Sequence, residues 1–72
     1  MENTSLKTQL GSRIARLRSA CGISQATFAL MVGVSRKYLI DIEGGRANPT
    51  VDMLERIASG LDTSVVELFL DS

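Results

Sequence analysis

The stretch QATFALMVGVSRKYLIDIEGG, residues 25–45, contains the pattern that decides the fold. It predicts two short helices, residues 25–32 and 36–43, because apolar residues recur with helical spacing on one face of each segment. Gly33 lies between them and favours a left-handed turn, and Ser35 is a preferred residue for the N-cap of the second helix. The stretch therefore predicts two helices that cross steeply at a short turn.

The second of these helices has a packing face and an outer face. Helical spacing places Tyr38, Leu39, Ile42 and Glu43 on the packing arc, and Arg36, Lys37, Ile40 and Asp41 on the outer arc. Ala29 is small where the two helices approach closely, and Val34 helps to hold the second helix against the first. The outer arc is then a ridge of the width that the major groove of B-DNA accepts.

The rest of the chain is predicted to form three further short helices and no strand. The breaks fall at Gly22, Gly33, Gly44-Gly45 and Asn48-Pro49, with a weaker one at Gly60. The first helix begins near Thr4 or Ser5 and runs to Cys21, Thr50 caps a fourth helix, and Ser64 caps a last helix to about Leu70. We expect one domain over residues 1–72, a compact all-α bundle of five helices.

Some positions in the first and last helices carry expectations of their own. Gly11 weakens the N-terminal half of the first helix because glycine lowers helix propensity. Cys21 continues the apolar stripe of that helix and is expected to be partly buried. In the last helix, spacing predicts that Val65, Leu68 and Phe69 point inward.

The composition excludes several classes of protein. Hydrophobic residues make up 44% of the 72 residues, which suffices for one modest core and argues against disorder. There is no histidine and a single cysteine, so we expect no ordinary metal site, no internal disulfide and no cofactor. No apolar run approaches the roughly 20 residues of a membrane helix, and no signal peptide is evident. Without a glycine-rich phosphate loop or enough chain for a cleft, we expect no enzymatic activity.

The charge of the chain is divided between its two parts. Eight basic and eight acidic residues give a net charge of zero. Residues 1–48 contain seven of the basic residues and three of the acidic ones, a net charge of +4, and residues 49–72 carry −4. A neutral chain with this division can still present a basic surface to phosphate.

These segments together resemble the helix-turn-helix proteins of the phage repressor and Cro family, also called the XRE family. The resemblance is carried in order by RIARLRSACGISQ, QATFALMVGVS, YLIDIEGGRANPT and LERIASGLDTSVVELF, and it covers nearly the whole chain. It implies a lambda-repressor-like bundle of five helices that binds double-stranded operator DNA, usually as a homodimer. It also implies a cytoplasmic protein of bacterial or phage origin.

The resemblance also implies roles for individual residues. The candidate DNA-binding residues are Gln25, Ser35, Arg36, Lys37, Tyr38, Ile40, Asp41, Arg46 and Asn48. Gln25 matches a glutamine that binds a backbone phosphate and braces the recognition helix. Arg18 and Glu43 match a structural pair that ties the first helix to the third. Arg46 and Asn48 lie in the loop that follows the DNA backbone.

Chemistry sharpens the roles expected for the first turn of the recognition helix. Arg36 can grip O6 and N7 of guanine with two hydrogen bonds, a contact that contributes roughly 1–3 kcal/mol of discrimination. Lys37 can instead contact a phosphate. Tyr38 either reaches a phosphate through its hydroxyl or packs against the bundle.

Three positions depart from the family pattern. Asp41 stands where the family often has an amide or a basic residue, so it either accepts from cytosine N4 or pairs with Lys37 one turn earlier. Ile40 is apolar on the outer arc and can touch a thymine methyl group. Gly44 replaces a polar residue that often binds phosphate, which leaves only its backbone N–H for that purpose.

Exposed apolar residues suggest contacts with other protein molecules. Val66 and Leu70 lie off the inward face of the last helix, and with Phe69 they form the predicted homodimer interface, either alone or together with the fourth helix. Leu30 and Met31 point away from the core side of the second helix. They are either scattered surface residues, which are common, or a contact for another protein.

The leading functional interpretation is a sequence-specific transcriptional regulator, a repressor that occupies a palindromic operator as a dimer. The absence of a sensor domain argues against a small-molecule effector. The alternative is a protein-interaction module of the same fold, such as an antitoxin or an adaptor.

Overall fold

The computed structural model describes residues 5–70, and this part of the chain contains five helices and no strand. The helices are α1 (Leu6–Ala20), α2 (Gln25–Val32), α3 (Arg36–Glu43), α4 (Val51–Gly60) and α5 (Val65–Leu68). This confirms the predicted bundle of five helices. Ser5 is the N-cap of α1, and Thr4, the alternative start, lies outside the described residues.

Every helix begins at a hydroxyl side chain. In each case the hydroxyl oxygen accepts from the backbone N–H three residues later, and the pairs are Ser5–Thr8, Ser24–Thr27, Ser35–Tyr38, Thr50–Met53 and Ser64–Glu67. A cap of this kind contributes typically about 1 kcal/mol to stability. The local sequence therefore determines where each helix starts.

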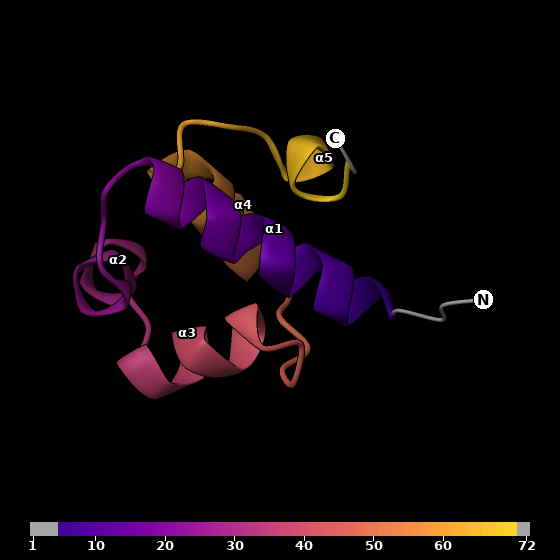
Figure 1. The fold of residues 1–72 in the computed structure, drawn as a ribbon, viewed down its shortest axis with the longest axis horizontal. Helices are drawn as coiled ribbons and strands as arrows, with labels where there is room; N and C mark the ends of the chain where they lie inside the picture. Colours follow the sequence, from indigo (N-terminus) through magenta and orange to yellow (C-terminus); the bar gives the residue numbers. More distant parts are fainter. Residues whose placement is uncertain (1–4, 71–72) are drawn as a thin grey trace.

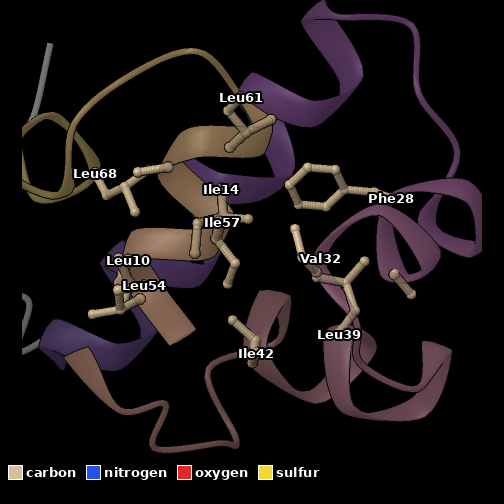
Figure 2. Close-up of a cluster of buried hydrophobic side chains, with 12 residues drawn as sticks. Leu10, Ile14, Phe28, Val32, Leu39, Ile42, Leu54, Ile57, Leu61 and Leu68 are labelled. Carbon is tan, nitrogen blue, oxygen red and sulfur yellow. The ribbon is translucent and has the colours of Figure 1, made fainter. Parts of the chain in front are cut away.

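The helices surround one apolar core, to which all five contribute. Helix α1 packs against α3 and α5, while α2 packs against α3 and α4 (Figure 1). The buried side chains that meet between them are Leu10, Ile14, Phe28, Ala29, Val32, Leu39, Ile42, Leu54, Ile57, Ala58, Leu61 and Leu68, most of which Figure 2 labels. Nearly all of them are aliphatic, so the short helices can approach one another closely.

Gly11 shows that a glycine expected to weaken α1 has a packing role. It is buried, and a Cβ atom there would collide with the carbonyl oxygen of Ile42 and lie 2.8 Å from that of Glu43. Only glycine therefore lets α1 lie directly on the C-terminal end of α3. The lower helix propensity of this position is offset by a contact that no other residue permits.

Two expectations about burial were wrong. Cys21 is exposed because α1 ends at Ala20 and Cys21 is its C-cap, past the last turn that faces the core. Helix α5 ends at Leu68 instead of Leu70, so Phe69 lies at the C-cap and is 38% exposed. Because α5 has only one turn, helical spacing does not predict where Phe69 points. Leu68 is buried and Val65 is partly buried, as predicted.

The connection between α4 and α5 contains the only non-glycine residue with a positive φ among residues 5–70. Helix α4 ends at Gly60, and Asp62 has a φ of 58°. This connection lies on the opposite side of α1 from α3 (Figure 1).

In the described part of the chain, no helix has the length and apolar character needed to cross a lipid bilayer.

Candidate nucleic-acid interface

The turn between α2 and α3 is fixed by backbone geometry. Gly33 has a φ of 79° and ends α2, and the N–H groups of Gly33 and Val34 both donate to the carbonyl of Ala29, at 2.9 and 3.0 Å. Ala29 itself is 3% exposed, which confirms that a small residue lies at the closest approach. Ser35 then caps α3 two residues after Gly33, so this short connection restricts the angle at which the two helices cross.

Helix α3 divides into a buried and an exposed face, as predicted. Leu39 and Ile42 are buried in the core, whereas Arg36 and Lys37 are exposed on the first turn. Ile40 and Asp41 are partly buried, so the outer arc is less open towards its C-terminal end. The first turn is thus the most accessible part of the predicted recognition helix.

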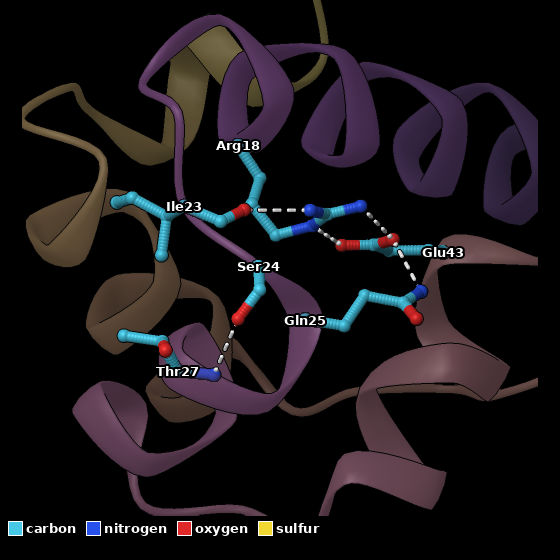
Figure 3. A network of polar contacts seen from close by, with 6 residues as sticks. All are labelled: Arg18, Ile23, Ser24, Gln25, Thr27 and Glu43. Carbon is cyan, nitrogen blue, oxygen red and sulfur yellow. Dashed lines mark hydrogen bonds and ion pairs between the residues drawn. The ribbon is translucent and has the colours of Figure 1, made fainter.

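An ion pair connects α1 to the end of α3, which confirms the predicted link between these helices. Arg18 Nε donates to Glu43 Oε2 at 2.7 Å and Arg18 Nη2 to Oε1 at 3.1 Å, while Nη1 donates to the carbonyl of Ile23 at 2.7 Å (Figure 3). The two side chains are only 14% and 6% exposed. The hydrogen bond to Glu43 raises the pKa of Arg18, against a smaller effect of burial. Because the pKa is higher in the folded than in the unfolded chain, the pair contributes stability at every pH below the ordinary pKa of arginine, which includes the neutral range.

Gln25 joins the same carboxylate from α2. Its Nε2 atom donates to Glu43 Oε1 at 3.0 Å (Figure 3). The bracing role of Gln25 is therefore visible in the geometry, while its contact with phosphate stays a prediction. Gln25 keeps a second amide hydrogen, and as the first residue of α2 its backbone N–H has no partner within the helix.

A second group of charges lies at the other edge of α3. Asp41 accepts from Lys37 Nζ at 3.3 Å on Oδ2 and from Arg46 Nε at 3.4 Å on Oδ1. Of the two alternatives for Asp41, pairing with Lys37 is thus present in the free protein. The contact with Arg46 was not predicted, because it depends on how the loop after α3 folds back.

The backbone of this loop corrects the expectation for Gly44. Its N–H donates to the carbonyl of Ile40 at 2.9 Å, and the next two N–H groups donate to Ile42 and Asp41 at 3.1 and 2.8 Å. The Gly44 N–H therefore closes the end of α3 and does not point outward towards a phosphate. Gly45, with a φ of 76°, makes this close turn possible.

The other candidate residues lie around the exposed turn of α3. The Ser35 hydroxyl accepts from the Tyr38 N–H at 3.0 Å but retains its own hydrogen as a donor. Tyr38 is partly buried and packs against the core, which is one of its two predicted roles. Asn48 is exposed in the loop between α3 and α4. These residues lie at the N-cap of α3, on its first turn and in the loop that follows it.

Arg56 is a structural residue of this region that sequence reasoning missed. Its Nη1 atom donates to the carbonyl of Val32, the last residue of α2, at 3.1 Å. It is the only basic residue in residues 49–72, and this isolated position among acidic residues was the feature of the sequence that could have indicated a structural role. Arg56 therefore closes the end of α2 beside the turn, a role that basic side chains commonly have.

Two sets of exposed apolar side chains lie outside α3. Val66, Phe69 and Leu70 are 67%, 38% and 48% exposed at the C-terminal end. Beside them, Leu6 and Leu10 of α1 line a groove of about 320 Å³ together with Arg13, Arg16, Leu68, Phe69 and Leu70. Leu30 and Met31 on α2 are 83% and 54% exposed, as their helical positions predict. Both sets are available for contact with other molecules.

Sequence comparison relates this chain to known regulators. The helix-turn-helix (HTH_3) family profile matches residues 14–68. The chain is 41% identical over 63 residues to the HTH-type transcriptional regulator y4dJ of Sinorhizobium fredii, covering 88% of this chain and 82% of the relative. It is 34% identical over 67 residues to the control protein C.MunI of a Mycoplasma species, covering 92% and 90%.

Structural comparison gives the same relation. The crystal structure of the restriction-modification controller protein C.AhdI from Aeromonas hydrophila matches with a TM-score of 0.83 and 35% sequence identity. The match covers 86% of this chain and 94% of that protein. Both the fold and the length of this chain are thus similar to those of a regulator.

Proposed function

Because this chain belongs to the helix-turn-helix (HTH_3) family of DNA-binding transcriptional regulators, we propose that it represses transcription by occupying a palindromic operator as a homodimer. The observation that carries this proposal is the exposed first turn of α3, where Arg36 and Lys37 extend from a helix fixed at both ends. In this proposal α3 enters the major groove. The protein acts in the cytoplasm of a bacterial host, without a small-molecule effector.

The proposed contacts divide into those that read bases and those that hold the backbone. Arg36 reads a guanine through two hydrogen bonds, and Ile40 packs against a thymine methyl group. Gln25 and Asn48 bind phosphates on either side of the groove, as does Ser35 at the start of α3. The phosphate contacts fix the position of the helix, and the base contacts give the sequence preference.

Dimer formation through the C-terminal end follows from the need for affinity. One domain of this size makes few phosphate contacts, and twofold pairing doubles them. Val66, Phe69 and Leu70 form the apolar surface for this pairing, since burial of exposed apolar area favours association. Two copies of α3 then lie about 34 Å apart, one turn of DNA.

Selection of bound sequences from random duplex DNA, at two salt concentrations, tests the DNA-binding proposal. We expect enrichment of a palindromic site and a steep fall in affinity as salt rises. Weak binding without any enriched sequence would contradict the proposal. The same selection with Arg36→Ala shows whether the preference arises at α3.

Sedimentation of a charge-introducing variant tests the dimer. We expect Val66→Glu to shift the protein to the monomer and to weaken operator binding, because the new carboxylate would be buried against its symmetry mate. Leu30→Glu is the control, since Leu30 is an exposed apolar residue of α2, outside the proposed dimer interface. A Val66→Glu protein that still sediments as a dimer would disprove this interface.

A second function is favoured by Leu30, whose side chain is 83% exposed on α2. A protein-interaction module of the antitoxin or adaptor type would use Leu30 and Met31 to hold its partner. If Arg36→Ala leaves DNA affinity unchanged, this second function becomes the better explanation.

A further inference from the structure

Three charged side chains form a connected group along the outer edge of α3. The two carboxylate oxygens of Asp41 each hold a different cation, Oδ2 that of Lys37 and Oδ1 that of Arg46, at 3.3 and 3.4 Å. Lys37 is 86% exposed and Arg46 60%, whereas Asp41 between them is 30% exposed. The group has a net charge of +1, although it contains two cations on the proposed DNA-facing side.

Fold stability does not explain this arrangement. Exposed ion pairs contribute about 0–1 kcal/mol, because water and salt screen them. A lysine and an arginine without the carboxylate would also attract phosphate more strongly. Asp41 therefore lowers the general attraction of this face for DNA, with little gain in folding free energy.

Gly44 belongs to the same arrangement. A Cβ atom at this position would lie 2.7 Å from Cζ of Arg46, so the missing side chain leaves the space that the guanidinium occupies. The backbone N–H of Arg46 also donates to the carbonyl of Asp41 at 2.8 Å, which holds the two residues together. Two of the three departures from the family pattern, Asp41 and Gly44, thus form one structural feature.

We propose that Asp41 is a specificity-determining residue, an internal counter-ion that weakens the contacts of Lys37 and Arg46 with phosphate on DNA of the wrong sequence. When the cations move to phosphates, the carboxylate is left unpaired next to the negatively charged backbone. That repulsion is relieved where the facing base pair offers an amino group, such as N4 of cytosine, to a carboxylate oxygen. This inference rests on the proposed binding of DNA and adds the source of its selectivity.

The test compares two variants that change net charge equally. Asp41→Asn removes the counter-ion, and Asp62→Asn removes an equal charge in the connection between α4 and α5, where asparagine tolerates the positive φ. For each we measure affinity for a random-sequence duplex across a salt series, and affinity for the selected site. We expect Asp41→Asn to bind the random duplex about five- to tenfold more tightly, with a salt slope steeper by about 0.9 for each cation released.

The selected site gives the second half of the expected result. Its affinity for Asp41→Asn should rise less than that of the random duplex, so the ratio of specific to non-specific affinity falls. Introducing Asp41→Asn into a Lys37→Gln, Arg46→Gln protein should give no larger change than Asp62→Asn does. This comparison, made with and without the two cations, separates the counter-ion effect from a change in net charge.

Two results would overturn the inference. If Asp41→Asn and Asp62→Asn change the random-duplex affinity and salt slope equally, Asp41 has no special role, while the DNA-binding proposal stands. If the unmodified protein binds neither duplex at any salt concentration, both proposals fail together.

Gly44→Ala adds a variant without a charge change. We expect it to shift partly towards the behaviour of Asp41→Asn, because the new methyl group displaces Arg46.

Discussion

The first and last turns of α3 belong to one eight-residue helix but have opposite surroundings. The last turn is built into the bundle, since Ile42 is buried and Glu43 binds side chains from both α1 and α2. The first turn presents Arg36 and Lys37 to solvent. Changes at the last turn should therefore reduce stability, while changes at the first turn should reduce DNA binding and leave stability nearly unchanged.

Glu43→Ala should have the largest effect of the variants that separate the two turns. It leaves Arg18 and Gln25 without their carboxylate, and removal of one partner from a buried pair costs about 3–5 kcal/mol. Urea denaturation measures this change. Arg36→Ala is the control on the same helix, and an equal loss in both variants would show that the two turns do not differ.

Gly11→Ala should reduce stability by a smaller amount, about 2–3 kcal/mol, because overpacking forces α1 and α3 apart. The higher helix propensity of alanine offsets roughly 1 kcal/mol of this loss. Gly22→Ala provides a contrast, since no atom lies within 4 Å of the new Cβ there and only its φ of 72° opposes the change. If Gly11→Ala were neutral by thermal unfolding, the close contact between α1 and α3 would be unimportant.

Arg36→Ala should act on the other turn. We expect a loss of about 1–3 kcal/mol of discrimination at one base pair of the selected site, with a change in unfolding free energy below about 0.5 kcal/mol. Competition between the selected site and single-base variants measures the discrimination. A uniform loss across all variants would indicate that Arg36 contacts phosphate instead of a base.

Arg56→Met should give the smallest effect, a loss of about 1 kcal/mol of stability through the missing hydrogen bond to Val32. Methionine keeps much of the aliphatic stem, so the change isolates the charged group. Chemical denaturation is the measurement. An unchanged midpoint would show that the end of α2 does not need this contact.

Local patterns predicted most of the fold because its boundaries are local. The hydroxyl of Ser24 and the glycine at position 33 act within three or four residues, and both were readable in sequence. The role of Gly11 was not predicted because the group that requires a glycine there, the carbonyl of Ile42, lies 31 residues further along the chain. Arg56 was missed because it bonds to a residue 24 positions earlier.

The candidate site shows the same limit. Its exposed residues followed from helical spacing, as did the pairing of Asp41 with Lys37, since residues four apart on a helix are neighbours. The second partner, Arg46, follows from the loop geometry at Gly44 and Gly45, which spacing does not describe. Sequence thus identified one of the two cations that pair with Asp41, Lys37, but not the other, Arg46.

The hydroxyl caps have a consequence for the electric field around the molecule. Aligned peptide groups give the start of a helix a partial positive charge, which an acidic residue in the first turn neutralises. Asp52 in α4 and Glu67 in α5 do this, whereas the first turns of α1, α2 and α3 contain no acidic residue and follow the uncharged caps Ser5, Ser24 and Ser35. At α2 the carboxylate of Glu43 lies beside the first residue, Gln25. The start of α3 therefore keeps its partial positive charge, on the side where phosphate is proposed to bind.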